Sequence, residues 1–191
     1  MTLRRTLDLH GLTVQLDSLT NFDELFEQLL AKGEESEEVR DERIPYWADL
    51  WPSAVALGRY LINSELVKPE TSVIEIGCGL GLPGIVAGIL GARDVHFTDY
   101  LEDALSYAKQ NWELNCTHPA RFSLLDWRQP DAALAADLVL ASDVAYETRF
   151  FPSSPMLSEP SANPAAASCS ANPDAKSPRY SSTPCRNWDL K

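Results

Sequence analysis

The sequence predicts an α/β fold in which helices cover an open sheet of parallel strands. Residues 73–76 form a short apolar run rich in β-branched side chains, as expected of a strand buried on both faces of such a sheet. Glycines follow at positions 77, 79 and 81 and lead into an apolar, helix-like stretch over 85–90. Strand-like and helix-like segments alternate after it, and a polar cluster ends each strand. Ligands bind at that edge of parallel sheets, so we expect a binding site there.

The composition narrows the functional class. At 191 residues, the chain can form one domain with a sizeable core, and possibly a tail. A net charge of −12 argues against a nucleic-acid surface and suits either a basic protein substrate or simple dispersal in the cytosol. No apolar run approaches membrane-spanning length, and 7–16 alternates too regularly for a signal peptide. The sequence therefore predicts neither a nucleic-acid nor a membrane partner.

Cysteine and histidine spacing indicates a cytoplasmic protein without a metal. The four cysteines, at 78, 116, 169 and 185, include no closely spaced pair, so reduced thiols are expected. The three histidines are scattered, with no spacing typical of metal ligands.

Residues 1–43 are expected to form an N-terminal extension. The alternation over 7–16 around a glycine predicts a small hairpin or an edge strand. A short amphipathic helix should follow over 22–30, after a start at 20–23 that resembles a capping box. The charged residues 34–42 predict a solvated loop.

The core is expected to begin at residue 44, with a helix that starts at Pro52. Trp47 and Trp51 precede this helix, and two explanations for them stay open. They plug the edge of the core, or they form a wall over a cofactor, because flat apolar rings suit an adenine or a sulfonium cation.

Three more strands are predicted, each followed by polar residues. Residues 94–98 lead into Asp99, about 20 residues after the glycine turn, where nucleotide-binding α/β units place a carboxylate on the ribose. Capping of the helix over 102–114 is the alternative role for Asp99. Residues 121–125 lead into Asp126 and Trp127, and residues 136–141 lead into Ser142 and Asp143.

The glycine spacing separates two kinds of ligand. A dinucleotide fingerprint has its third glycine three residues after the second, and Leu82 occupies that position, which disfavours an oxidoreductase. Glu75-x-Gly77-x-Gly79-x-Gly81 instead resembles the first motif of class I S-adenosylmethionine (SAM) methyltransferases.

With its other motifs, the chain resembles methyltransferase family 16, the seven-β-strand protein-lysine methyltransferases, in its bacterial form. It is also similar to the electron-transfer-flavoprotein β-subunit lysine methyltransferases. The resemblance covers roughly residues 44–151, and its matching stretches are 45–47 with 51–52, 75–84, 98–99, 126–127 and Asp143-x-x-Tyr146. It implies a Rossmann-like class I fold, SAM as the cofactor and a protein lysine as the acceptor.

The resemblance also implies roles for individual residues. The implied cofactor-binding residues are Trp51, Glu75, Gly77, Cys78, Gly79, Gly81, Asp99, Asp126, Trp127 and Ser142. Asp143 and Tyr146 would be catalytic and face the incoming amine. A lysine amine, with a pKa near ~10.4, must lose its proton before it attacks a methyl group, and carboxylate and phenol oxygens can orient it. Val144 and Ala145 stand where adenine-N6 methyltransferases carry two prolines, which argues against a nucleic-acid acceptor.

Residues 152–191 depart from this pattern. They contain seven of the thirteen prolines and nine serines, with no apolar period, which predicts a disordered tail. The abrupt change favours a frameshifted end over a natural tail. The sheet should then lack its last three strands, so 137–141 would be an exposed edge and the domain would fold poorly. Two alternatives to a protein-lysine methyltransferase stay open: a small-molecule N- or O-methyltransferase, and an inactive remnant.

Overall fold

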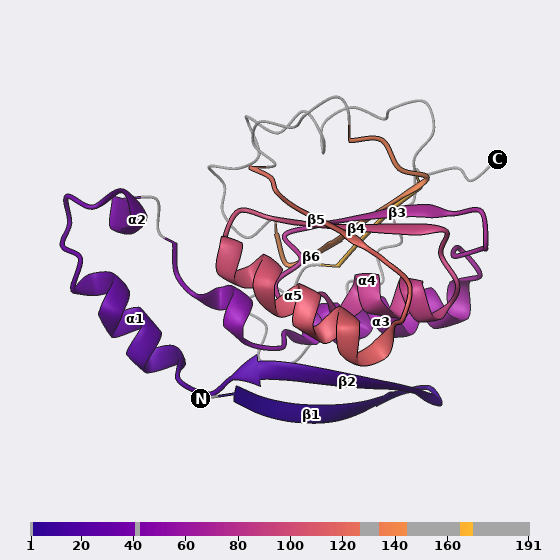
Figure 1. Cartoon of the computed structure of the whole chain (residues 1–191), viewed down its shortest axis with the longest axis horizontal. Helices are drawn as coiled ribbons and strands as arrows, with labels where there is room; N and C mark the ends of the chain where they lie inside the picture. The colour runs from indigo at the N-terminus through magenta and orange to yellow at the C-terminus, as the bar shows by residue number, and fades with distance from the viewer. Residues whose placement is uncertain (1, 41–42, 127–133, 145–164, 170–191) are drawn as a thin grey trace.

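The computed structural model describes residues 2–40, 43–126, 134–144 and 165–169, which form three layers (Figure 1). A parallel sheet with the strand order β5-β4-β3-β6-β7 lies above a layer of helices, and a two-stranded hairpin lies beneath them. The strands of the sheet and the helices between them are β3 (Ser72–Ile76), α4 (Leu82–Ile89), β4 (Asp94–Asp99), α5 (Glu102–Asn115), β5 (Arg121–Leu124), β6 (Leu138–Ser142) and β7 (Ala165–Cys169). The predicted Rossmann-like α/β fold is confirmed.

The sheet is centred on β3, which is buried along its whole length. It pairs in parallel with β4 on one side and with β6 on the other. Ile76 lies opposite both Thr98 and Ala141, so the three strands end level with one another.

The core fills the space between the sheet and the helices. Phe97 of β4 is fully buried, and its ring stacks on Phe122 at 5.0 Å and meets Trp112 of α5 edge-on at 5.5 Å. Helix α4 approaches this cluster closely because it has a glycine at position 84. A Cβ there would lie 2.4 Å from Cε1 of Phe97. The glycine is therefore a packing requirement of the fold.

The N-terminal extension confirms the predicted hairpin and helix. Strands β1 (Thr2–Leu9) and β2 (Leu12–Leu19) pair antiparallel across His10 and Gly11, whose φ angles are 55° and 89°. Positive φ at both central residues is typical of the tight turn that matches strand twist. Helix α1 (Phe22–Leu30) follows, as expected.

The charged stretch 34–42 is not entirely a loop, because it contains the short helix α2 (Glu37–Arg40). Ser36 precedes this helix, and its Oγ accepts a hydrogen bond from the Val39 N–H at 3.3 Å. The same stretch forms ion pairs with Arg40 and Arg43. These local bonds explain why a charged segment folds into a helical turn. The turn η1 (Tyr46–Ala48) and helix α3 (Pro52–Ser64), which begins at the predicted proline, complete the order.

The expectation that the strand over 137–141 is an exposed edge is wrong. β7 pairs with β6 in parallel, from Leu138 opposite Ala165 to Ser142 opposite Cys169. The strand ladder is made by backbone N–H and C=O groups, so a segment of small residues can complete it. The rest of the predicted tail lies outside the described residues.

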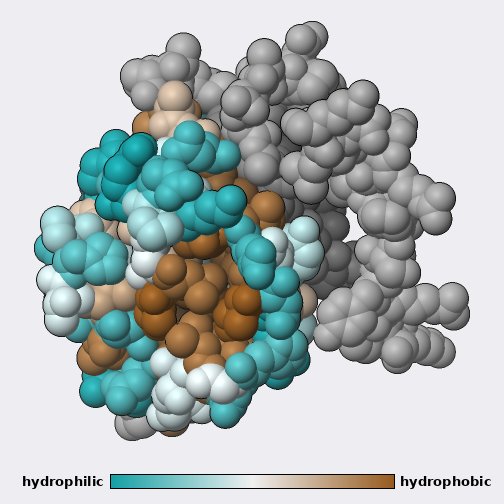
Figure 2. All heavy atoms as spheres, turned by 90° about the vertical axis from the view of Figure 1, so that its right-hand side faces the viewer, coloured by the Kyte–Doolittle hydropathy of each residue, from teal (hydrophilic) through white to brown (hydrophobic). Residues whose placement is uncertain are grey.

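Figure 2 turns the right-hand end of Figure 1 toward the viewer. In the coloured part of this face, hydrophobic residues gather near the middle, with hydrophilic residues on both sides of them. Within the described ranges, no helix is both long and apolar enough to cross a membrane.

Candidate functional site

The predicted ligand-binding edge is formed by the carboxyl ends of four parallel strands. Asp99 is level with Leu124 at the ends of β4 and β5, and the Leu125 N–H donates to the Asp99 carbonyl at 2.8 Å. The register of β3 with β4 and β6 places the glycine turn between Asp99 and Ser142. The structure therefore brings the predicted residues of the glycine turn, Asp99, Asp126, Ser142 and Asp143 to one edge.

In the turn between β3 and α4, every second residue is a glycine in the left-handed conformation. Gly77, Gly79 and Gly81 have φ angles of 59°, 50° and 80°, a region that L side chains rarely adopt. The Gly81 N–H donates to the Cys78 carbonyl at 2.7 Å, and the Cys78 N–H donates to the Thr98 carbonyl at 3.0 Å. A Cβ on Gly77 would lie 2.6 Å from Cγ1 of Val144. The turn thus offers bare backbone, in contact with the segment that follows β6.

Cys78 contributes to this turn mainly through its backbone. Its side chain is buried, and this burial, with the nearby Asp99 and Glu75 carboxyls, raises the pKa of the thiol well above its usual value. A protonated thiol is a weak nucleophile. Covalent chemistry at Cys78 is therefore disfavoured.

Asp99 joins the glycine turn to helix α5. Its Oδ2 accepts a hydrogen bond from the Gly79 N–H at 3.0 Å, and its Oδ1 accepts one from the Leu101 N–H at 3.0 Å. Leu101 is the residue before α5, so Asp99 binds backbone just ahead of the helix, and no described side chain caps the helix itself. Burial raises the pKa of the Asp99 carboxyl, and its backbone donors oppose that rise. Ribose binding by Asp99 stays a prediction.

Glu75 is a fully buried carboxyl that faces α4. Its Oε2 accepts a hydrogen bond from the Gly84 N–H at 2.9 Å, in the first turn of that helix, which has no other side-chain cap. Its Oε1 has no hydrogen-bond partner among the described residues. Burial, and secondly the Asp99 carboxyl, raise the pKa of Glu75 well above its usual value. The observed role of Glu75 is to anchor α4 beneath the turn, and contact with a cofactor stays a prediction.

An aromatic segment borders the glycine turn. The Trp47 backbone lies 3.6 Å from where a Cβ on Gly79 would be. Trp51 is 40% exposed, its Nε1 donates to the Tyr46 carbonyl at 2.7 Å, and its ring meets that of Tyr46 edge-on at 5.8 Å. This exposure favours contact with a cofactor over packing at the edge of the core as the role of the Trp51 ring. Tyr46 belongs to the matching stretch 45–47, but no role was predicted for it from the sequence.

A cavity of about 420 Å³ lies immediately beyond Asp99. Its lining residues are Arg43, Tyr100, Leu101, Glu102, Asp103 and Leu124. Arg43 donates to the Tyr100 hydroxyl at 3.0 Å, and its guanidinium lies 5.1 Å from the centre of the Tyr100 ring. Neither residue was predicted from the sequence, and for Tyr100 the available signal was its position directly after Asp99.

The carboxyl end of β6 carries the residues predicted to lie near the methyl acceptor. Ser142 is the last residue of the strand and is half-buried. Asp143 follows with a φ of 58°, a left-handed conformation that aspartate adopts more readily than most residues. Trp127 and Tyr146 lie outside the described residues, so their roles stay predictions. Among the residues that are described, no group of three His, Cys, Asp or Glu side chains could hold a metal ion.

Residues 39–158 match the model of a family described as lysine methyltransferase (Methyltransf_16). The chain is 36% identical over 103 residues to the electron transfer flavoprotein beta subunit lysine methyltransferase of Danio rerio, covering 54% of this chain and 40% of that protein. It is 34% identical over 107 residues to the histone-arginine methyltransferase METTL23 of Homo sapiens, covering 53% of this chain and 56% of that protein. The chain spans about half the length of the curated relatives it matches.

Solved structures show a further likeness. The ribosomal protein L11 methylase of Lactobacillus delbrueckii subsp. bulgaricus matches with a TM-score of 0.43 and 26% identity, over 49% of this chain and 48% of that one. The tRNA (uracil-54, C5)-methyltransferase of Pyrococcus abyssi, in complex with S-adenosyl-L-homocysteine, matches with a TM-score of 0.44 and 22% identity, over 73% and 28%.

Proposed function

This chain belongs to the lysine methyltransferase family, a family of SAM-dependent methyltransferases, and we propose that it transfers the methyl group of SAM to a protein lysine. The observation that supports this most is the meeting of the glycine turn, Asp99 and Asp143 at one edge of the sheet. The cofactor would be held on the β3 and β4 side, and the acceptor would enter on the β6 side.

The residues present fit the cofactor. The bare backbone of Gly77, Cys78 and Gly79 suits its methionine part, because any side chain on Gly77 would collide with Val144. The buried carboxylate of Asp99 can accept hydrogen bonds from ribose hydroxyls in the same way as it accepts the Gly79 N–H. Trp51 is exposed and lies four residues after Trp47, whose backbone borders the turn, so its ring could contact a sulfonium or an adenine.

Asp126 follows β5 and Ser142 ends β6, so both lie farther along the same edge. Asp126, with Trp127, would border the adenine, and Ser142 would place backbone near the sulfonium. When bound, SAM supplies an electrophilic methyl carbon on a sulfonium. The free thiols of Cys78 and Cys116 suit a reducing compartment such as the cytoplasm.

The acceptor side needs a group that orients a neutral amine. Asp143 directly follows β6, so its carboxylate is carried at the same edge as the glycine turn. An oxygen there can hold one amine hydrogen while the nitrogen lone pair points at the methyl carbon. Tyr146 would supply a second oxygen. The protein's part in the rate is then mainly alignment.

Titration calorimetry with S-adenosylhomocysteine tests the cofactor half of the proposal. The wild type should bind, and Asp99→Ala should weaken binding at least about tenfold, because it removes a buried acceptor. Asp94→Ala is the matched control, since Asp94 lies at the opposite end of the same strand and pairs with Arg121. Equal affinity in all three proteins would contradict the assignment of Asp99, and no binding by the wild type would contradict the function.

Transfer of a labelled methyl group from SAM into a cell lysate tests the acceptor half. We expect label in the protein fraction, and methyl-lysine after hydrolysis. Methyl-arginine would instead support the activity in the name of METTL23, and label in metabolites would support a small-molecule acceptor. Cofactor binding without any transfer would identify an inactive remnant.

A further inference from the structure

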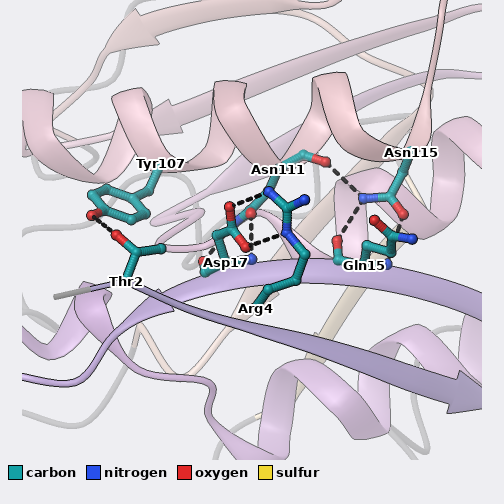
Figure 3. A network of polar contacts seen from close by, with 7 residues as sticks. All are labelled: Thr2, Arg4, Gln15, Asp17, Tyr107, Asn111 and Asn115. Carbon is teal, nitrogen blue, oxygen red and sulfur yellow. Dashed lines mark hydrogen bonds and ion pairs between the residues drawn. The ribbon is translucent and has the colours of Figure 1, made fainter.

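Two asparagines on α5 bind the edge of the N-terminal hairpin (Figure 3). Asn115 accepts the Gln15 N–H at 2.8 Å and donates to the Gln15 carbonyl at 2.7 Å. In the same way, Asn111 accepts the Asp17 N–H at 2.7 Å and donates to the Asp17 carbonyl at 3.0 Å. The two asparagines are four residues apart on the helix, a rise of about 6 Å, and their two partners are two residues apart on the strand, about 6.8 Å. The two distances therefore match. The helix therefore satisfies the backbone of β2 as a neighbouring strand would.

The two asparagines differ in their third hydrogen bond. Asn111 is fully buried, and its Nδ2 also donates to the Leu80 carbonyl at 3.0 Å, inside the glycine turn. Asn115 instead donates to the Asn111 carbonyl of its own helix at 2.7 Å. Of these two side chains, only that of Asn111 joins the hairpin to the turn.

The hydrogen bonds of the Asn111 side chain fix its orientation. Both Nδ2 hydrogens go to carbonyls, those of Asp17 and Leu80, and Oδ1 accepts a backbone N–H. Asp17 is itself tied to Arg4 of β1 by two hydrogen bonds of 2.8 Å. The Leu80 peptide, between two left-handed glycines, is thus attached to a part of the chain distant in sequence.

We propose that Asn111 is a positioning residue for cofactor binding, which holds the Leu80 carbonyl, and with it the glycine turn, against the N-terminal hairpin. This inference rests on the proposed function. A turn with three glycines has many alternative backbone conformations when it is free, and these must be given up on binding. A buried amide that fixes one peptide of the turn lowers that cost. The hairpin is then part of the support of the cofactor site.

Calorimetry with S-adenosylhomocysteine on Asn111→Ala and Asn115→Ala tests this inference. Both substitutions remove the paired bonds to β2, and only the first removes the bond to Leu80. We expect the dissociation constant to rise about tenfold in Asn111→Ala and by less than about twofold in Asn115→Ala, with stoichiometry unchanged. Equal changes in the two variants, or a lower stoichiometry with an unchanged dissociation constant in Asn111→Ala, would overturn it. Failure of the wild type to bind would overturn the proposed function as well.

Hydrogen exchange of the wild type gives an answer even where Asn111→Ala does not fold. The amides of Gln15 and Asp17 lie on the same strand and bond to equivalent asparagines. Because Asn111 links Asp17 to the turn, S-adenosylhomocysteine should slow exchange at Asp17 more than at Gln15. Equal slowing at both amides, or at neither, would overturn the inference.

Discussion

The two halves of the strand-end edge are built differently. On the β3 and β4 side, carboxyl oxygens bind backbone N–H groups of the fold itself: Glu75 binds Gly84, and Asp99 binds Gly79 and Leu101. On the β6 side, Asp143 directly follows the strand and itself has the left-handed conformation. The motif residues of the first half therefore support the fold and the ligand site together. For the second half, the proposed role is to orient the methyl acceptor.

The halves touch at Gly77 and Val144. This contact makes the comparison testable. Substitutions on the β3 side should change stability or cofactor affinity, and substitutions on the β6 side should change turnover.

The largest effect is expected for Gly84→Ala on the β3 side. Alanine normally favours a helix by about 1 kcal/mol over glycine. Here its Cβ would lie 2.4 Å from Phe97 and 2.6 Å from Glu75, so we expect a net loss of about 3 kcal/mol in the free energy of unfolding. Denaturant unfolding checks this.

Gly58→Ala in α3 is the control for Gly84→Ala. Its Cβ would meet its nearest neighbours at ordinary distances of 3.4 and 3.5 Å. We expect it to be neutral or slightly stabilising. A similar loss in both variants would show that close packing at Gly84 is not the cause.

Asp143→Asn tests the β6 side. Asparagine tolerates the left-handed backbone as well as aspartate does, so the fold should be kept. The loss of a carboxylate beside the amine should lower kcat about 100-fold, while affinity for S-adenosylhomocysteine stays within about twofold. Steady-state kinetics and calorimetry check the two expectations, and an unchanged kcat would remove Asp143 from the reaction.

Gly77→Ala tests the contact between the halves. The new Cβ would lie 2.6 Å from Val144, so the turn must shift, and affinity for S-adenosylhomocysteine should fall about tenfold. Gly91→Ala shares the positive φ but has open space around it, and its affinity should stay unchanged. Val144→Ala added to Gly77→Ala should restore part of the affinity. Equal affinities of Gly77→Ala and Gly91→Ala would show that the collision is unimportant.

The smallest effect concerns the hairpin that supports the β3 side. The hydrogen bond from Arg4 lowers the pKa of Asp17 in the folded state, so the associated stability is present above the unfolded pKa of about 3.9 and is lost as the pH falls through the folded value. Asp17→Asn should therefore destabilise most at neutral pH and progressively less below about pH 3.9. Arg4→Gln should weaken this pH dependence, and a pH-independent difference would contradict the ion pair's role.

Local patterns in the sequence predicted most of the fold. Periodicity, Pro52 and the glycine turn placed the strands β3 to β6 and their helices within a few residues, because these signals act on neighbouring residues. β7 was missed, since Ala165–Cys169 has no β-branched residue and lies among prolines. Its pairing depends on the open edge of β6, which is a tertiary feature.

The sequence predicted which residues form the site, but only part of how they are arranged and bonded. Asp99 was found from its spacing and Glu75 from the resemblance of its motif, but the backbone N–H groups that they bind were not predicted. Asn111 was not found, because its partners lie 94 and 31 residues away in the chain. A helical asparagine gives no sign in sequence that it reaches a distant turn.

The most direct test of the account is a map of backbone amide shifts in ¹⁵N-labelled protein as S-adenosylhomocysteine is added. We expect shifts at residues 77–81, 100–101 and 142–144, with little change at the opposite ends of the strands, near Ser72 and Asp94. Saturable shifts that avoid the glycine turn and the end of β6, or no shifts at all, would contradict the cofactor site at this edge.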